Sequence, residues 1–354
     1  MSGNVIEYAG RLRVKTRKKI RNGEWHGFFL FALGAVAPIV LMVIVGYFFK
    51  KIGWMDERFA KKANKMVFRA FMPVMLFVKI YCIPNLAEMD FGFVGYAAIA
   101  IIAIFVLTIP ATIAVTKHRD RRGVLVQAAF RSGYSLIGIP LAESLYGEPG
   151  AVAATLLSTV AIPIFNVLAV VSLSALGAEG GEKPSVKKIV LDIVKNPLIL
   201  GIASAMVAIG IRSIFARIGI SFRLSDIGPL FDVLQYLSNL AIPLALLVLG
   251  AQFEFSAVAS LKCEIVFGTL VRTVIVPAFT LVIAYVFFRE RFTPAHFATF
   301  VAVFATPVAV PSVPMVQEMG GDVTLAGQLV VWSTLISAVT VFLVTLLLRL
   351  GGAF

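Results

Sequence analysis

The chain has 354 residues, of which 59% are hydrophobic and 14% charged, and its formal net charge is +13. This composition excludes an ordinary soluble globular protein, and the long apolar runs exclude the alternating strands of a membrane β-barrel. The sequence therefore predicts an integral membrane protein whose spans are α-helices. The two cysteines and three histidines stand apart from one another, so neither a disulfide framework nor a metal site is expected.

The basic residues flank the apolar runs, which is the pattern of orientation signals and contacts with lipid headgroups. The expected partners are therefore the lipid bilayer and a small molecule, and no nucleic acid. Residues 1–27 form a basic N-terminal tail. The tail resembles the start of a signal peptide, but the apolar run that follows is longer than a signal peptide's apolar core and is interpreted as a span.

Ten apolar runs, separated by charged or turn-rich residues, predict ten spans. They cover residues 28–49, 62–82, 91–116, 124–146, 150–177, 196–214, 231–251, 263–288, 295–318 and 324–349. A polar central linker, residues 178–195, separates residues 28–177 from residues 196–354. Because each half then holds five spans, similar halves would be inverted relative to each other in the membrane.

Proline positions repeat between these halves. Three prolines have counterparts in the same order: Pro38 with Pro197, Pro73 with Pro243, and Pro110 with Pro277. The match is closest between the fourth and ninth spans, where Pro140 and Pro314, and likewise Gly133 and Pro307, are 174 residues apart. The pattern predicts an all-α membrane protein of ten helices, built as two inverted five-helix repeats.

The fourth and ninth spans also contain helix-breaking residues. In hydrocarbon a break is tolerated only where protein or a water-filled cavity satisfies the opened backbone, and two broken helices in corresponding places mark a transporter's binding site. The pairing of Gly133 with Pro307 places the crossover beside Arg131 rather than at Pro140. The residues expected to shape the breaks are Gly133, Gly138, Pro140, Pro307, Pro311 and Pro314.

The loops after the first, third and fifth spans are rich in Lys and Arg, whereas those after the second and fourth contain none. By the positive-inside rule the basic loops, including the central linker, face the cytoplasm, and both termini lie outside. The basic tail opposes this orientation. The expected location is the inner or plasma membrane, as a multi-pass protein.

The cations within predicted spans include Arg69, Lys79, Arg131 and Arg272. Snorkelling to the interface is the expectation for the first two. Arg131 lies deeper and abuts the predicted break, where its guanidinium could bind a carboxylate through two parallel hydrogen bonds. The alternative is a structural ion pair, but no Asp or Glu lies mid-span. The role of Arg272 stays open, and pairing with backbone carbonyls at a break is one option.

Half-helices aim their positively polarised amide ends at a break, which favours an anion. With Arg131 as the carboxylate ligand, the candidates for hydrogen bonds to a substrate are Ser132, Ser135, Asn166, Thr306 and Ser312. For each hydroxyl alone, the competing outcome is a bond back to its own helix. No nucleotide-binding loop, zinc-protease motif or nucleophile with a histidine accompanies these residues, so neither enzyme activity nor a cofactor is expected.

Several stretches, in this order and spacing, resemble the auxin efflux carrier family. They are FRSGYSLIGIPLAESLYG at 130–147, KNPLILGI at 195–202, IPLALLVLGAQF at 242–253, RTVIVP at 272–277 and ATPVAVPSVPMVQEMGGD at 305–322. The resemblance runs from about Gly34 onward. It implies crossing broken helices 4 and 9, as in bile-acid and sodium/proton exchanger architectures, and elevator-like alternating access. It also implies organic-anion substrates, which are auxin in plants and malate- or malonate-type carboxylates in bacteria.

The chain departs from this family at one break. Members often have asparagine where this sequence has Gly133, so Arg131 and Ser135 would supply more of the polar contacts. The short central linker lacks the long hydrophilic insert of plant members, which favours a bacterial-type carboxylate permease.

The sequence thus predicts a secondary transporter of small organic anions, such as mono- or dicarboxylates or auxin-like acids. The alternative is a membrane sensor that binds the same anion without moving it, although the signalling domain usual in such sensors is not among the predicted elements. The coupling ion, proton or sodium, the direction of transport and the oligomeric state are left open, with a homodimer as one option.

Overall fold

The computed structural model describes residues 25–83, 90–177, 185–219 and 221–353, with the backbone alone described at 25–33 and 35. Of the predicted tail, residues 1–27, only the last three fall within these ranges, where they begin the first helix. Across the described ranges the regular structure is helical, and the extended pairing there is limited to one isolated antiparallel bridge. The all-α prediction is confirmed at this level.

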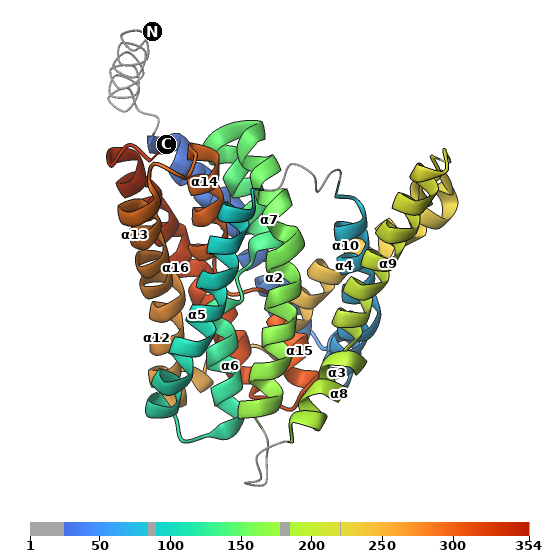
Figure 1. Cartoon of the computed structure of the whole chain (residues 1–354). Helices are drawn as coiled ribbons and strands as arrows, with labels where there is room; N and C mark the ends of the chain where they lie inside the picture. The colour runs from blue at the N-terminus through green and yellow to red at the C-terminus, as the bar shows by residue number, and fades with distance from the viewer. Residues whose placement is uncertain (1–24, 84–89, 178–184, 220, 354) are drawn as a thin grey trace.

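Figure 1 shows the arrangement of the helices. In chain order they are α2 (Trp25–Lys51), α3 (Glu57–Met66), η1 (Val67–Phe71), α4 (Met72–Tyr81), α5 (Phe91–Val115), α6 (Arg119–Phe130), η2 (Tyr134–Gly138), α7 (Ile139–Leu176), α8 (Val186–Lys195), α9 (Pro197–Arg217), η3 (Leu224–Asp226), α10 (Gly228–Gln252), α11 (Ala257–Ser260), α12 (Lys262–Leu270), η4 (Val271–Ile275), α13 (Val276–Phe288), α14 (Pro294–Phe304), α15 (Ser312–Glu318) and α16 (Val323–Leu350). The described part of the predicted linker is thus mostly the short helix α8.

Six helical stretches of the described chain are long and apolar enough to cross a membrane. They are Phe91–Val115, Tyr134–Leu176, Pro197–Arg217, Gly228–Gln252, Lys262–Phe288 and Val323–Leu350. Large apolar side chains on these stretches lie on the outside of the molecule, and Ile99, Val207 and Phe287 are 70%, 62% and 74% exposed. Such surfaces are stable in lipid rather than in water, so the chain is a multi-pass membrane protein.

Three π-helical segments each precede a proline by two residues. They are η1 before Pro73, η2 before Pro140 and η4 before Pro277. Proline lacks an N–H, and its ring clashes with the carbonyl four residues earlier, so a wider turn ahead of it lets the helix continue. Pro140, expected at a break, therefore lies in the first turn of a helix that runs on from η2.

Helix α7 joins the predicted fourth and fifth spans through a kink. Tyr146 and Gly147 leave the helical conformation there, and Gly147 has a φ of 66°, which residues with a side chain rarely adopt. The chain can therefore reverse direction between the two spans with almost no loop.

The helices pack in two groups. One contains α2, α3, α4, α9 and α10. The other contains α5, α6, α12, α13, α14, α15 and α16, and α7 packs mainly against α14 and α6 of this group. Figure 1 shows α9 and α10 on one side of the molecule and α12 and α13 on the other. The groups meet where α2 contacts α16 and where α15 contacts α3.

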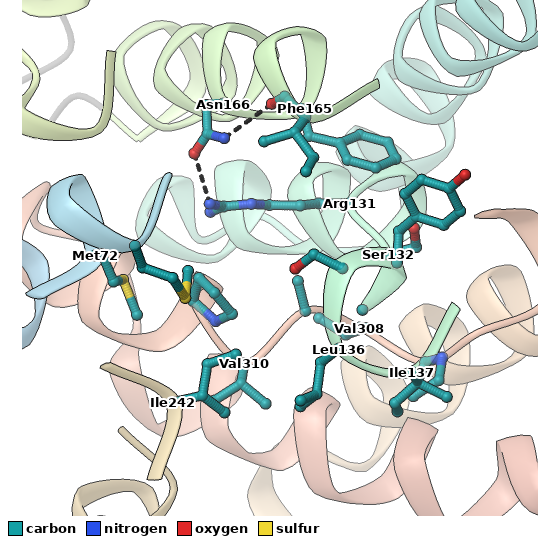
Figure 2. Close-up of a pocket in the computed structure, with 18 of the residues that line it drawn as sticks. Met72, Arg131, Ser132, Leu136, Ile137, Phe165, Asn166, Ile242, Val308 and Val310 are labelled. Carbon is teal, nitrogen blue, oxygen red and sulfur yellow. Dashed lines mark hydrogen bonds between the residues drawn. The ribbon is translucent and has the colours of Figure 1, made fainter. Parts of the chain in front are cut away.

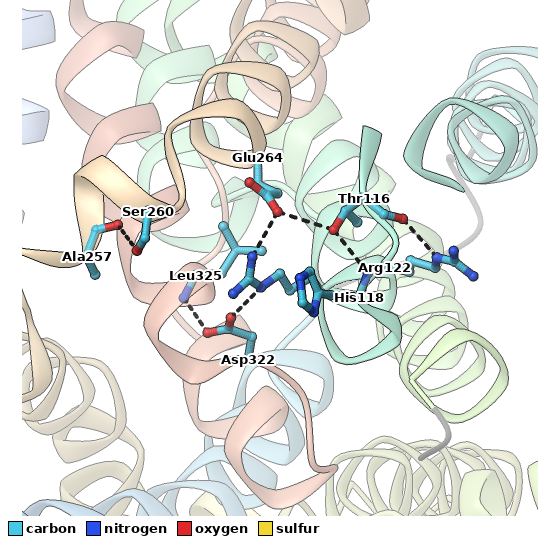
Figure 3. Close-up of polar contacts among 9 residues, drawn as sticks. Thr116, His118, Arg122, Ala257, Ser260, Glu264, Asp322 and Leu325 are labelled. Atoms are coloured by element: carbon cyan, nitrogen blue, oxygen red, sulfur yellow. Dashed lines mark hydrogen bonds and ion pairs between the residues drawn. The ribbon is translucent and has the colours of Figure 1, made fainter. Parts of the chain in front are cut away.

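An ion-pair network fixes one end of the second group. Arg121 in α6 lies 3.0 Å from Glu264 of α12 and 3.0 Å from Asp322, the N-cap of α16 (Figure 3). The Thr116 hydroxyl also donates to Glu264 at 3.2 Å. Because three helices share these partly buried contacts, they are held together as a unit at this end.

Two glycines bring α2 and α10 into backbone contact. A side chain on Gly46 would overlap the carbonyl oxygen of Leu247, and one on Gly250 would overlap that of Val43. Small residues at such crossings let membrane helices approach closely.

Gly250→Val should therefore force α2 and α10 apart and lower the free energy of unfolding by about 1–3 kcal/mol. The melting temperature of the purified, detergent-solubilised protein measures this effect. Gly210→Val is the matched control, because a Cβ on Gly210 of α9 would meet nothing within 4 Å. Equal melting temperatures for the two variants would show that the contact is not tight.

Candidate functional site

Two helices of the second group are interrupted, and their interruptions meet. The first lies between the end of α6 at Phe130 and the start of η2 at Tyr134, and the second between α14 and α15. Ser132 and Val308 pair as an antiparallel bridge. The Gly133 amide donates to the Pro307 carbonyl at 2.7 Å, and the Ala309 amide donates to the Arg131 carbonyl at 3.1 Å. The two breaks therefore satisfy part of each other's opened backbone, as hydrocarbon surroundings require.

Neighbouring helices support the crossing. The Val308 amide donates to the Ser333 hydroxyl of α16 at 3.0 Å. Gly138 lies against α14, since a Cβ there would stand 2.7 Å from the carbonyl oxygen of Ala302. A Cβ at Gly133, in contrast, would meet the Pro307 oxygen at an ordinary 3.5 Å. Gly138 is thus required by close approach, whereas Gly133 leaves space beside the cavity.

The prolines expected at the breaks occupy different places. Pro307 lies inside the second interruption, and Pro311 is the N-cap of α15. Pro314 lies in the first turn of α15, just as Pro140 lies in the first turn of α7. Pro314 is tolerated because the amide that it lacks would have no partner in a first helical turn, whereas Pro140 is accommodated by the π-helical turn before it. The true interruptions are therefore residues 131–133 and 305–311.

A small cavity of about 50 Å³ lies at the crossing. Its walls come from both groups of helices, including Met72 of α4, Ile242 of α10 and Phe165 of α7 (Figure 2). A cavity of this size holds at least one water-sized group. Because it lies between the two groups, a shift of one group against the other would change its size and its access.

Arg131 supplies the charge of this cavity. Its side chain is only 4% exposed and lies across the cavity toward Asn166 (Figure 2). One terminal nitrogen donates to the Asn166 side-chain oxygen at 2.8 Å, and the other contacts the sulfur of Met315 at 3.0 Å. Neither partner is an anion, and no ion pair to Arg131 is found among the described residues. The cavity therefore carries an uncompensated positive charge.

The candidate polar residues divide into two sets. Four of the six line the cavity: Arg131, Ser132, Ser135 and Asn166. The Ser132 hydroxyl is buried without a hydrogen-bond partner in the described chain. Asn166 is oriented by its own helix, since its amide donates to the Ile162 carbonyl at 2.8 Å.

Thr306 and Ser312 lie outside the lining. The Thr306 hydroxyl donates to the Ala302 carbonyl of its own helix at 2.8 Å, which was the competing outcome for such hydroxyls. The Ser312 hydroxyl, at the start of α15, is buried without a hydrogen-bond partner in the described chain.

Three polar or sulfur-bearing residues of this region were not among the candidates: Gln127, Met315 and Thr334. Gln127 stands four residues before Arg131 and so shares its face of α6, a spacing that could have revealed it. Its amide approaches Met315 at 3.5 Å, while Thr334 lines the cavity from α16. No local sequence signal indicates Met315, because its partners come from another helix.

The family model described as "Membrane transport protein" matches residues 31–345. The chain belongs to the auxin efflux carrier family. An uncharacterized transporter of Methanothermobacter thermautotrophicus is 24% identical over 321 residues, which cover 88% of this chain and 97% of that relative. The resemblance found in the sequence is therefore confirmed, and membership of a membrane-transport family indicates transport rather than catalysis.

For this auxin efflux carrier homologue, the chemistry of the site favours an anion over a metal ion. No group of three His, Cys, Asp or Glu side chains that could hold a metal is found in the part of the chain that the structure describes. The cavity instead offers a guanidinium and hydroxyls, which donate hydrogen bonds to oxyanions.

Proposed function

We propose that the chain is a secondary transporter of small organic anions, mono- or dicarboxylates such as malate or malonate, that works by alternating access. The observation that carries the proposal is Arg131, a buried cation at the crossing of two interrupted helices whose partners in the described chain are all neutral. A carboxylate in the cavity would compensate this charge, and the unpartnered Ser132 hydroxyl would donate to the same group.

The same proposal includes ten membrane crossings arranged as two inverted five-helix repeats. Two facts support it. The residues matched at a separation of 174, Gly133 and Pro307, are hydrogen-bonded to each other. In addition, an antiparallel pair such as Ser132 with Val308 has a two-fold axis between its chains, as inverted repeats require.

Alternating access is supported by the difference between the two ends of the site. On one side a groove of about 640 Å³ continues from the cavity between α2, α4 and α10, past Lys79 and Asn239. Lys79 donates to the Ser135 carbonyl at 3.1 Å, so a second cation stands beside this route. An anion entering from this side would meet positive charge before it reaches Arg131.

The other side is closed by a carboxamide cluster of Asn64, Gln252 and Gln317. Asn64 donates to the side-chain oxygens of Gln252 at 3.0 Å and Gln317 at 2.9 Å, which ties α3, α10 and α15 together. Arg69 pairs with Glu318 at 2.8 Å next to it. Gln252 stands about 20 Å further along α10 than Asn239, so the closed end and the groove lie on opposite sides of the crossing. If the basic loops face the cytoplasm, the cluster closes the cytoplasmic side.

Counterflow in proteoliposomes tests the proposal. Vesicles that contain the purified protein and are preloaded with unlabelled malate or malonate should accumulate the labelled anion transiently, because a carrier exchanges solute across the membrane. Protein-free vesicles are the control. Saturable binding of these carboxylates without any counterflow would instead identify a sensor.

Ser132→Ala should weaken the apparent affinity for the carboxylate about tenfold, because one hydrogen bond to a charged group is lost. It should not lower the melting temperature, since an unpartnered buried hydroxyl is removed. Ser312→Ala is the matched control, because this hydroxyl is also buried and unpartnered but lies outside the cavity lining. Titration of transport against carboxylate concentration compares the two variants, and an equal loss in both would remove Ser132 from the binding site.

A further inference from the structure

Arg272 is a second fully buried cation, and it lies at the crossing of the two interrupted helices. Its side chain is 0% exposed and is not part of the cavity lining. Its Nε donates to the Thr306 carbonyl at 2.7 Å, and one terminal nitrogen donates to the Val303 carbonyl at 3.0 Å. The other terminal nitrogen donates to the Ala129 carbonyl at 3.0 Å. All these acceptors are backbone carbonyls at the two interruptions.

The carbonyls belong to the C-terminal ends of two half-helices. Ala129 is the penultimate residue of α6, and Val303 is the penultimate residue of α14. The last carbonyls of a helix have no partner within it, and the aligned peptide dipoles place about half a negative charge at this end. Two such ends amount to about one negative charge, which a single guanidinium balances.

Unwound carbonyls and half-helix C-termini are, in membrane carriers generally, the groups that coordinate a coupling cation. Here Arg272 already occupies the place between them. An arginine side chain stays protonated in proteins and is covalently fixed, so it cannot leave during a transport cycle as a bound ion can. Its hydrogen bonds also use carbonyls that a metal cation would need as ligands.

We propose that Arg272 is a positioning residue that replaces an exchangeable metal cation at the crossing. It holds the C-terminal ends of α6 and α14 together, and it leaves the positive charge of Arg131 available in the cavity. The crossing is therefore complete without sodium, and the carrier moves its anion independently of sodium. The statement that transport is independent of sodium rests on the proposed function. The structural statement, that Arg272 takes the place of a metal cation at the crossing, does not.

The structural statement is tested by chemical rescue of purified protein. Arg272→Ala should lower the melting temperature by several degrees or more, because several buried carbonyls lose their donor. Guanidinium chloride at low millimolar concentration should restore much of the loss by filling the vacated place, while sodium chloride and urea at the same concentration should not. Arg272→Met is the matched control, because its side chain removes the charge but fills the space, so guanidinium should not rescue it.

Equal responses of the alanine and methionine variants to guanidinium would overturn the proposal, and so would rescue of the alanine variant by sodium. If Arg272→Ala cannot be purified, Arg272→Lys carries the test. Its point charge reaches fewer carbonyls, so its melting temperature should lie below that of the unchanged protein and should not rise with sodium.

A further experiment uses the unchanged protein and needs no substrate. Its melting temperature should be the same in sodium, potassium and choline chloride at equal ionic strength, and a saturable rise specific to sodium would contradict the inference. Uptake of labelled carboxylate should likewise be equal in the three salts. Because the melting experiments do not depend on transport, a failure to find a transported carboxylate would count against the proposed function and leave the result for Arg272 standing.

Discussion

Arg131→Gln should reduce carboxylate transport on the order of 100-fold or more while the protein remains folded. The guanidinium can donate two parallel, charge-assisted hydrogen bonds, each of about 1.5–3 kcal/mol, whereas glutamine offers one neutral amide. A hundredfold loss corresponds to about 2.7 kcal/mol, which is within that range. Counterflow of labelled malate or malonate in proteoliposomes, at matched protein content, measures the effect.

The stability of the Arg131→Gln variant should not fall together with its transport. An unpaired cation inside a membrane protein costs at least ~2.5–3.5 kcal/mol, so its removal should leave the melting temperature unchanged or raised. Arg131→Lys is the control for charge without the planar fork, and its transport should lie between that of the unchanged protein and that of Arg131→Gln. Normal counterflow by a folded Arg131→Gln protein would refute the assignment of Arg131 as the anion ligand.

Asn166→Asp should weaken transport through the opposite change, by giving Arg131 an anionic partner. The Asn166 side-chain oxygen already lies 2.8 Å from the guanidinium, so an aspartate would form an ion pair there. At an effective dielectric constant of about 20, charges about 4 Å apart attract each other by about 4 kcal/mol, and a substrate carboxylate would have to displace this partner. We therefore expect apparent affinity to fall more than 100-fold, as measured by concentration-dependent counterflow.

Asn166→Ala separates the effect of charge from the loss of the amide. Alanine removes one neutral acceptor and leaves the guanidinium available, so transport should fall only severalfold. The melting temperature should move in opposite directions, rising for aspartate and falling slightly for alanine. Similar transport by the two variants would mean that the charge of Arg131 is not what the substrate recognises.

The sequence indicates Arg131 as the central charge of this site because a cation is unusual within an apolar run. Arg131 stands deep in an apolar run, and Asn166 is the sole asparagine of its run, so composition alone draws attention to both. The meeting of Gly133 and Pro307 follows from repeat matching, which uses information from the whole chain.

Side-chain direction near a break could not be predicted in the same way. Thr306 lies in a short irregular segment and Ser312 directly follows it, and neither helical nor strand periodicity there indicates which way a residue points. Met315 approaches Arg131 from a different helix, and such contacts depend on how the two breaks cross. The acceptors of Arg272 likewise come from two separate half-helices, so its role becomes visible only in three dimensions.

Proline positions predicted the interruptions of the two helices only in part. Pro140 breaks the usual helical hydrogen-bond pattern, but the π-helical turn before it absorbs the defect and the helix continues. The interruption at residues 131–133 contains no proline at all. A glycine next to a charge was therefore the better indicator there, because Gly133 also matches Pro307 at a separation of 174 residues.

In the proposed transport cycle, the carboxamide cluster must separate when the side of the site that it closes opens. Asn64, Gln252 and Gln317 carry no charge and bind no protons, and the adjacent pair is weak because the Arg69 side chain is 59% exposed. No carboxamide gains or loses a proton when these contacts break, so pH has little effect on them. Salt screens charge interactions, and the contacts contain only one weak ion pair, so salt also has little effect. The balance between the closed and open forms should thus be nearly insensitive to pH and ionic strength, which leaves occupation of the cavity by the anion as the variable that shifts it.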